Sequence, residues 1–134
     1  MMKRYQCHKI SEGTAEATAV ISKDHIMFYL MNPETGEVIE NAHDIEGRSV
    51  AKKILIFPGG KGSSVVQADG LYQLNMHGNM PSAMVVQYPE TVLVSSAIIM
   101  EVPMVDKVDP QFYEDVKDGD TIRVDATDGI IEIL

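Results

Sequence analysis

Apolar residues recur along this chain in short runs, some continuous and some alternating with polar residues. Alternation with a period of two is typical of half-buried strands, whereas a continuous run of four or five apolar residues is typical of a strand buried on both faces. These patterns predict strands at about Tyr5–Ile10, Thr14–Ile21, Ile26–Leu30, Val38–Ile39, Lys53–Phe57, Ala83–Gln87, Met104–Val105, Thr121–Asp125 and Ile130–Leu134.

Two longer segments repeat apolar residues every three or four positions, which is the period of a helix. The predicted helices are Ser64–Met76 and Thr91–Glu101, the second closed by Pro103, and a shorter helical turn follows near Pro110–Val116. An Asp-Gly turn separates the last two predicted strands, which favours a terminal hairpin. The chain is therefore expected to be a mixed α/β fold, rich in strands and with two main helices, in a single domain over residues 1–134.

The apolar run Ile54–Phe57 leads into a turn with the sequence Pro-Gly-Gly-Lys-Gly-Ser-Ser, residues 58–64, just before the first predicted helix. Unpaired N–H groups and the positive end of a helix dipole meet at such a place, and glycines let a ligand approach the main chain, so the turn predicts an anion site. It does not match a nucleotide-binding P-loop, because Gly62 separates Lys61 from Ser63. The alternative is a plain strand-to-helix turn with Ser63 as the N-cap.

Composition narrows the class of protein. Of 134 residues 45% are hydrophobic, which is enough for a sizeable core. The formal net charge is −9, from 20 acidic and 11 basic residues without a long basic run, so nucleic acid is not an expected partner. No apolar stretch reaches the roughly 18–20 residues that cross a bilayer, and the N-terminus lacks the apolar core of a signal peptide. We therefore expect no membrane association and a cytoplasmic location, which the single cysteine also fits.

Side chains that commonly bind metals are few and scattered. His8, His25, His43 and His77 show no ligand spacing, and Cys7 precedes His8 on a predicted strand, where neighbouring side chains point to opposite faces. An iron–sulfur cluster needs three or four cysteines, so this chain is not expected to hold one alone. The nine methionines are more typical of core packing than of a binding surface.

Several short motifs, in a fixed order and spacing, together carry a resemblance to a known family. They are Ile10-Ser11-Glu12-Gly13, Asn32-Pro33-Glu34-Thr35-Gly36, His43-Asp44 with Gly47-Arg48-Ser49-Val50, Phe57 to Ser64, Pro103-Met104-Val105-Asp106 and Asp118-Gly119-Asp120. On these motifs, over nearly its whole length, the chain resembles the small, swivel-domain subunit of the aconitase-X hydro-lyases. That family includes archaeal phosphomevalonate dehydratase and bacterial cis-3-hydroxyproline dehydratase.

Two segments depart from the family pattern, and both flank the glycine-rich turn. Leu30-Met31-Asn32 stands where family members carry a Gly-Gly pair, and the residues from Val65 to Asp69 stand where archaeal members continue with a Val-Gly-Ser-Tyr-like run. These departures leave the family resemblance in place. They weigh more against phosphomevalonate as the substrate than against the family.

The resemblance implies a fold, a partner and a reaction. The fold is the swivelling β/β/α domain, and the partner is an aconitase-X large subunit that carries an iron or iron–sulfur centre. The pair would eliminate water from a small hydroxy acid such as cis-3-hydroxyproline or phosphomevalonate, with Ser63 as the base. The residues expected to contact the substrate are Gly60, Lys61, Gly62 and Ser64. The alternative is a non-catalytic swivel module that binds an anionic metabolite or a protein partner through the turn Gly59–Ser64.

Overall fold

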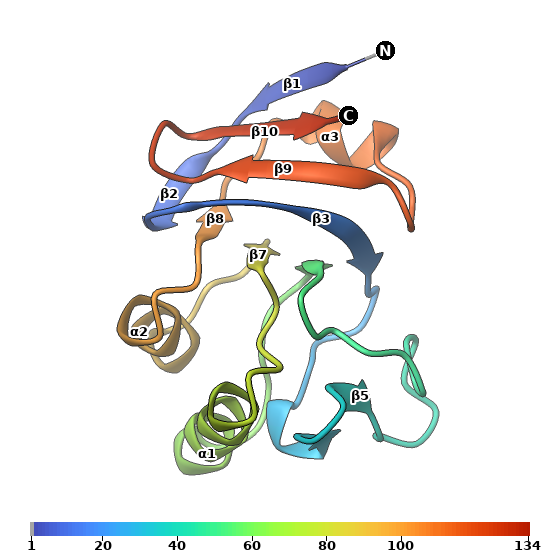
Figure 1. Cartoon of the computed structure of the whole chain (residues 1–134), viewed down its shortest axis with the longest axis vertical. Coiled ribbons are helices and arrows are strands. Elements are labelled where there is room, and N and C mark those ends of the chain that lie inside the picture. The colour runs from blue at the N-terminus through green and yellow to red at the C-terminus, as the bar shows by residue number, and fades with distance from the viewer. Residues whose placement is uncertain (1) are drawn as a thin grey trace.

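The computed structural model describes residues 2–134, arranged in three layers (Figure 1). Within these residues an eight-stranded sheet runs in the order β1-β10-β9-β3-β6-β7-β8-β2. Cys7 alone separates β1 from β2, yet these strands pair at opposite ends of that order, β1 with β10 and β2 with β8. The sheet therefore curls into two facing layers, like a barrel. Its strands are β1 (Lys3–Gln6), β2 (His8–Ser11), β3 (Thr14–Ile21), β6 (Ile54–Phe57), β7 (Ala83–Val86), β8 (Met104–Asp106), β9 (Thr121–Asp125) and β10 (Ile130–Ile133).

Strand β3 belongs to both sheet layers. Residues 14–18 pair antiparallel with β9, and residues 19–21 pair parallel with β6. The parallel strands β6, β7 and β8 continue the second layer. Helices α1 (Ser64–Met76) and α2 (Thr91–Ile99) follow β6 and β7 and form the third layer, while α3 (Pro110–Asp115) lies at the opposite end of the molecule (Figure 1).

Side chains of the parallel strands alternate between two hydrophobic clusters. In β6, Leu55 and Phe57 pack beneath the helices, whereas Ile54 and Ile56 pack between the two sheet layers. All four side chains are buried, which explains why this strand appears in the sequence as a continuous apolar run. The helices add Leu71, Leu74, Leu93 and Ala97 to the first cluster.

The structure confirms the predicted mixed fold of two sheet layers and one helical layer, both main helices, and the terminal hairpin of β9 and β10. It corrects the strand expected at Tyr5–Ile10. That strand is broken at Cys7, whose N–H donates to the Gly129 carbonyl oxygen (2.9 Å), so that β1 and β2 enter different layers. None of the helices in residues 2–134 is long and apolar enough to cross a membrane.

The strand expected at Ile26–Leu30 is wrong. Residues 28–30 form a short 3-10 helix, in which the Leu30 N–H donates to the Met27 carbonyl oxygen (2.8 Å). Phe28 is buried against α1, and Gly70 permits this approach because a Cβ there would collide with the Phe28 backbone. Tertiary packing overrides the local pattern here. The next strands, β4 (Met31–Asn32) and β5 (Glu37–Val38), form a separate two-stranded ribbon.

Candidate functional site

The glycine-rich turn lies at the carboxyl edge of the parallel strands. β6 ends at Phe57, and the chain turns through residues 58–63 into α1; β7 is likewise followed by α2. Both helices therefore begin at this edge, where their dipoles are positive. The sequence prediction of a strand-to-helix turn is confirmed.

Two backbone hydrogen bonds attach this turn to the segment before the 3-10 helix. The Ile26 N–H donates to the Gly59 carbonyl oxygen (2.9 Å), and the Lys61 N–H donates to the Ile26 carbonyl oxygen (3.0 Å). A Cβ at Gly59 would lie 2.7 Å from the Tyr88 carbonyl oxygen, so only glycine fits that position. The rings of His25 and Tyr88 stack beside it, with centroids 6.2 Å apart.

Ser63 occupies the N-cap of α1, as the alternative interpretation of the turn predicts. Its Oγ accepts a hydrogen bond from the Val66 N–H at 3.4 Å, and the residue is exposed. Within the described chain, the N–H groups of Ser64 and Val65 meet no acceptor, as is usual for the first turn of a helix. The edge therefore offers an exposed hydroxyl beside unpaired amide donors, an arrangement that suits an anion.

The N-terminus of α2 differs from that of α1, because a carboxylate already occupies it. Both oxygens of Glu90 accept backbone hydrogen bonds, Oε2 from the Val92 N–H (3.0 Å) and Oε1 from the Leu93 N–H (2.9 Å). An anionic ligand would have to displace or repel this side chain. Of the N-termini of α1 and α2, that of α1 is the one available to an anion.

Lys61 is paired rather than isolated. Its Nζ lies 2.6 Å from Oε2 of Glu40, and both side chains are partly exposed. The second carboxylate oxygen of Glu40 is buried and has no hydrogen-bond partner within residues 2–134. The sequence analysis missed Glu40, because it lies 21 residues before Lys61 in a segment without a distinctive pattern.

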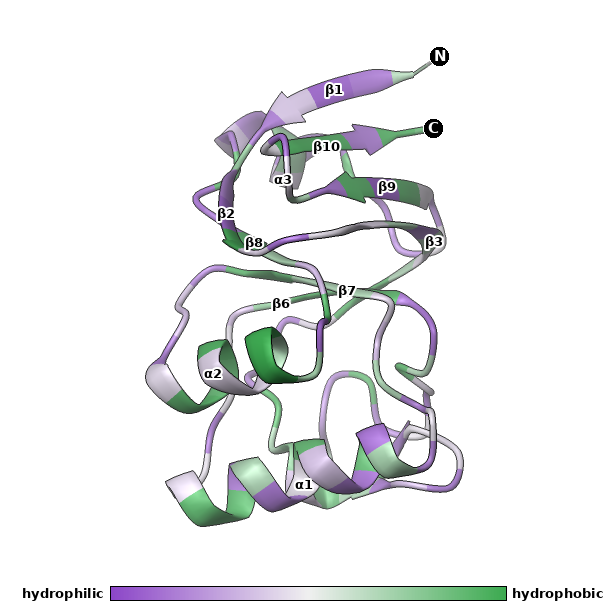
Figure 2. Cartoon of the chain, turned by 60° about the vertical axis from the view of Figure 1, so that its left-hand side comes forward, coloured by the Kyte–Doolittle hydropathy of each residue, from purple (hydrophilic) through white to green (hydrophobic). Residues whose placement is uncertain are grey.

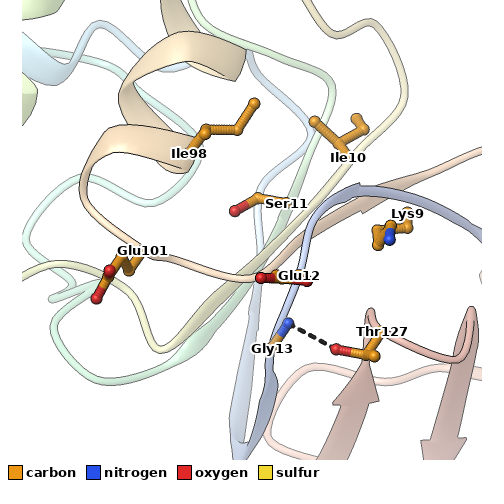
Figure 3. Close-up of a pocket in the computed structure, with 8 residues that line it drawn as sticks. All are labelled: Lys9, Ile10, Ser11, Glu12, Gly13, Ile98, Glu101 and Thr127. Atoms are coloured by element: carbon orange, nitrogen blue, oxygen red, sulfur yellow. Dashed lines mark hydrogen bonds between the residues drawn. The ribbon is translucent and has the colours of Figure 1, made fainter.

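The residues predicted to contact the substrate, Gly60, Lys61, Gly62 and Ser64, lie within five positions of the chain, but they do not line the more voluminous of two hollows in the described chain. Ser64 lines a groove of about 390 Å³ between α1 and α2, together with Val65, Thr91 and Ile99. The larger hollow, of about 700 Å³, lies where β2 turns into β3 beside the end of α2 (Figure 3).

Elsewhere, reactive side chains are engaged in structural contacts. His8 Nδ1 lies 2.7 Å from the buried carboxylate of Asp106. Burial, followed by the negative charges of Asp106 and Asp125, raises the pKa of the Cys7 thiol to about 11, so the thiol is protonated and weakly nucleophilic at neutral pH. Within residues 2–134, no three histidine, cysteine, aspartate or glutamate side chains gather to hold a metal ion.

Comparisons with known proteins now add a family to this geometry. Residues 4–133 match the aconitase X swivel domain. This chain belongs to the aconitase X swivel-domain family. The family resemblance inferred from the sequence motifs is therefore confirmed.

Relatives and solved structures agree with this family. The chain is 45% identical over 127 residues to a phosphomevalonate dehydratase small subunit of Methanocella arvoryzae, covering 94% of this chain and 96% of the relative. A phosphomevalonate dehydratase small subunit of Methanothrix thermoacetophila is 44% identical over 122 residues, covering 90% of this chain and 88% of the relative. The crystal structure of Thermococcus kodakaraensis aconitase X in its holo-form superposes with a TM-score of 0.89, at 40% identity and 98% coverage of both chains.

Proposed function

We propose that this chain is the small subunit of an aconitase-X-type dehydratase, which eliminates water from a small hydroxy acid. The observation that carries this proposal is the exposed Ser63 beside the unpaired N–H groups of Ser64 and Val65 at the start of α1, within the turn Gly59–Ser64 of an aconitase X swivel domain. Packing and backbone conformation account for the three glycines, and capping accounts for a serine at position 63. A purely structural turn would not also need a lysine beside that serine.

Ser63 is the proposed base, which takes the proton from the carbon next to the substrate carboxylate. A serine hydroxyl is a poor base in water, so its deprotonated form must be stabilised by its surroundings. The unpaired N–H groups of Ser64 and Val65, the positive end of the α1 dipole and the charge of Lys61 all favour negative charge at this position.

Lys61 is proposed to bind an acidic group of the substrate while it stays paired with Glu40. An ammonium group has three donors, so one can remain on the Glu40 carboxylate while another reaches the substrate. The Glu40 pair would then hold the flexible lysine stem in one direction. This arrangement agrees with substrate contacts from Gly60, Gly62 and Ser64, which lie within three residues of Lys61.

Phosphomevalonate is the substrate that the relatives favour. The two relatives at 44% and 45% identity are named phosphomevalonate dehydratase small subunits, whereas cis-3-hydroxyproline rests on the family resemblance alone. The departures from the family pattern at Leu30-Met31-Asn32 and after Ser64 weigh against phosphomevalonate. We give the relatives more weight, because their identity extends over nearly the whole chain.

The proposed partner is a large subunit, and the helical layer is the surface proposed to meet it. α1 and α2 have 13 and 9 residues and carry one charged side chain between them, Asp69, although 23% of the whole chain is charged. Val65 and Ile99 on this layer are 79% and 78% exposed and line the groove that begins at Ser64. Figure 2 shows the contrast between hydrophobic α2 and mostly hydrophilic β1. A surface with so few charges beside Ser63 suits a stable interface with a partner protein.

The residues of this chain do not fit a metal centre, since it has a single cysteine and the described part shows no cluster of ligands. The iron or iron–sulfur centre implied by the family is therefore proposed to be on the large subunit. The large subunit would then supply the metal centre, and this chain would supply the base and the contacts to the substrate anion.

Single-turnover dehydration of phosphomevalonate by the assembled heterodimer tests the proposal. Ser63→Ala should slow the reaction by about 10²–10⁴-fold, the usual contribution of a general base, while the variant still assembles and binds substrate. Ser64→Ala is the matched control and should be milder. Ser63→Ala that retains most of the rate would place the base elsewhere, and full activity of the large subunit alone would favour the non-catalytic module.

A further inference from the structure

Gln67 is a buried polar residue on the first turn of α1 that the proposed mechanism does not use. It is 4% exposed. Its backbone N–H donates to the Ser63 carbonyl oxygen (2.9 Å), and its side-chain Nε2 donates to the Gly62 carbonyl oxygen (3.2 Å). Its Oε1 is buried and has no hydrogen-bond partner in the described chain. A buried amide oxygen without a partner is unfavourable, so its retention here calls for a reason.

The Gln67 side chain also explains why residue 60 is a glycine. A Cβ built on Gly60 would overlap Oε1 of Gln67 and would lie 3.4 Å from its Cδ, and the next neighbour is Glu90 Oε1 at 3.8 Å. Gly60 is not among the glycines with a positive φ, so its backbone conformation does not by itself require glycine. The close contact with Gln67 is what excludes a side chain there.

We propose that Gln67 is a positioning residue that sets the conformation of the turn carrying Ser63. This inference rests on the proposed function and deepens it. Through one side chain and one backbone group, Gln67 contacts Gly60, Gly62 and Ser63 from inside the molecule. On the outer side, the Lys61–Glu40 ion pair holds the same turn. Displacement of the turn by about 1 Å would be enough to lower the rate about 10²-fold, because a base must approach its proton in one geometry.

Two replacements of Gln67 in the assembled heterodimer separate positioning from general stability. Gln67→Leu keeps most of the volume and removes both polar atoms, and it should lower kcat at least 10-fold with KM changed less than 3-fold. Gln67→Glu keeps the shape but adds a negative charge beside the turn, and should raise by roughly one unit the pH at which the rate reaches half its plateau. Gln73→Leu, the same change six residues further along α1, is the matched control and should leave kcat and the pH profile unchanged.

A double-mutant comparison tests the contact itself. Gly60→Ala should lower kcat and the melting temperature, and the addition of Gln67→Ala should restore part of both, because the colliding amide is removed. Gly59→Ala is the control. Its Cβ would meet the Tyr88 main chain, which Gln67→Ala cannot move, so no restoration is expected.

The outcomes distinguish this inference from the proposed function. If Ser63→Ala abolishes turnover while Gln67→Leu and Gln67→Glu keep wild-type kcat and pH profile, the proposed base stands and the positioning role of Gln67 is wrong. If Ser63→Ala keeps its rate, the proposed base is wrong, and the role of Gln67 in positioning it is wrong with it. Equal restoration of the Gly59→Ala and Gly60→Ala variants by Gln67→Ala would also overturn the specific contact.

Discussion

The carboxyl and amino edges of the parallel strands differ in the size of their hollows and in the charged groups that surround them. The carboxyl edge has two smaller hollows, of about 390 and 300 Å³, but it gathers the N-terminus of α1 and the turn Gly59–Ser64 with Lys61. The amino edge has the larger hollow, which Glu12, Glu101 and Lys9 line with other residues (Figure 3). α2 ends at this edge, so its last carbonyl groups and the negative end of its dipole face the same region.

This contrast teaches that volume alone does not locate a site for an anion. Two carboxylates and a helix C-terminus disfavour a negatively charged hydroxy acid in the larger hollow, despite its size. Gly13 at that hollow instead serves the turn between β2 and β3. Gly13 has φ 127° and approaches Pro103, while its N–H donates to the Thr127 hydroxyl (3.0 Å). At the carboxyl edge, glycines instead make room for the Tyr88 main chain and for the Gln67 amide.

Replacement of one lysine at each edge should give the largest difference in kcat/KM between the two edges. Lys61→Met should lower kcat/KM of the heterodimer about 10–100-fold, the value of a hydrogen bond to a charged group. Lys9→Met should change it less than 2-fold, because Lys9 lies at the amino edge and the proposed site lies at the carboxyl edge. Steady-state kinetics with phosphomevalonate measures both. Equal losses of kcat/KM would show that the two edges do not differ in function. Glu40→Gln is a further control: it keeps the Lys61 cation and removes its ion pair, so it separates the loss of the charge from the loss of the pair.

The next prediction compares the helical layer, which begins at the carboxyl edge, with the C-terminal end of the chain. Val65→Lys and Ile99→Lys should each raise the Kd for the large subunit about 30-fold or more, because a charge would be buried in an apolar interface. Leu134→Lys is the control, since Leu134 is also an exposed apolar residue but lies at the C-terminus, far from this layer (Figure 1). Titration calorimetry measures the three constants. Unchanged binding by the helix variants would place the interface on another face.

The sequence predicted the glycine-rich turn and its place in the fold, because the signals for both are local. A continuous apolar run, a turn and a helical period follow one another between Ile54 and Met76, and each can be recognised without tertiary contacts. The same reasoning fails at Phe28. There the apolar run is equally clear, but packing against Gly70 of α1 decides the backbone conformation.

The partners of the turn could not be predicted, because they depend on contacts between distant segments. Glu40 reaches Lys61 because the loop that follows β5 folds back against the segment after β3, where the Asp44 N–H donates to Oδ2 of Asp24 (2.9 Å). Buried His43 anchors that loop: its Nδ1 accepts from the Ile45 N–H (3.1 Å), so its Nε2–H donates to the His25 carbonyl oxygen (2.9 Å). Gln67 is likewise an ordinary polar position in a helical pattern, and only the close approach of Gly60 makes it distinctive.

The N-caps of α1 and α2 can be compared by how much each contributes to the free energy of unfolding. Ser63→Ala should lower the free energy of unfolding by about 0.5–2 kcal/mol, whereas Ser63→Asn should preserve it, because asparagine also accepts the hydrogen bond from the first turn. Glu90→Ala should lower the free energy of unfolding by a similar amount and leave the proposed anion site of α1 in place. Chemical denaturation of the isolated chain measures these differences. A stable Ser63→Ala variant that is nevertheless inactive would show that the hydroxyl is retained for the reaction alone.

The smallest expected effect lies on the other sheet layer, where Tyr5 of β1 donates a hydrogen bond to Asp115 of α3. That bond, with one from Gln111, lowers the pKa of Asp115, so its contribution to stability is present at neutral pH and is lost as the pH falls through the lowered pKa. Burial and then the Asp115 contact raise the pKa of Tyr5 to about 12, so the phenol stays neutral and its contribution is lost only at strongly alkaline pH.

Tyr5→Phe should therefore lower the melting temperature by about 3 °C at pH 7, and the difference from the wild type should shrink as the pH approaches 3. Tyr113→Phe is the matched control: its pKa is also raised to about 12, chiefly by burial, but its hydroxyl makes no hydrogen bond within residues 2–134. It should show no such pH dependence. Calorimetry across this range, with turnover measured on the assembled variants, tests whether this end of the molecule affects stability without affecting rate. A reduced kcat in Tyr5→Phe would mean that the site depends on the distant sheet layer as well as on its own edge.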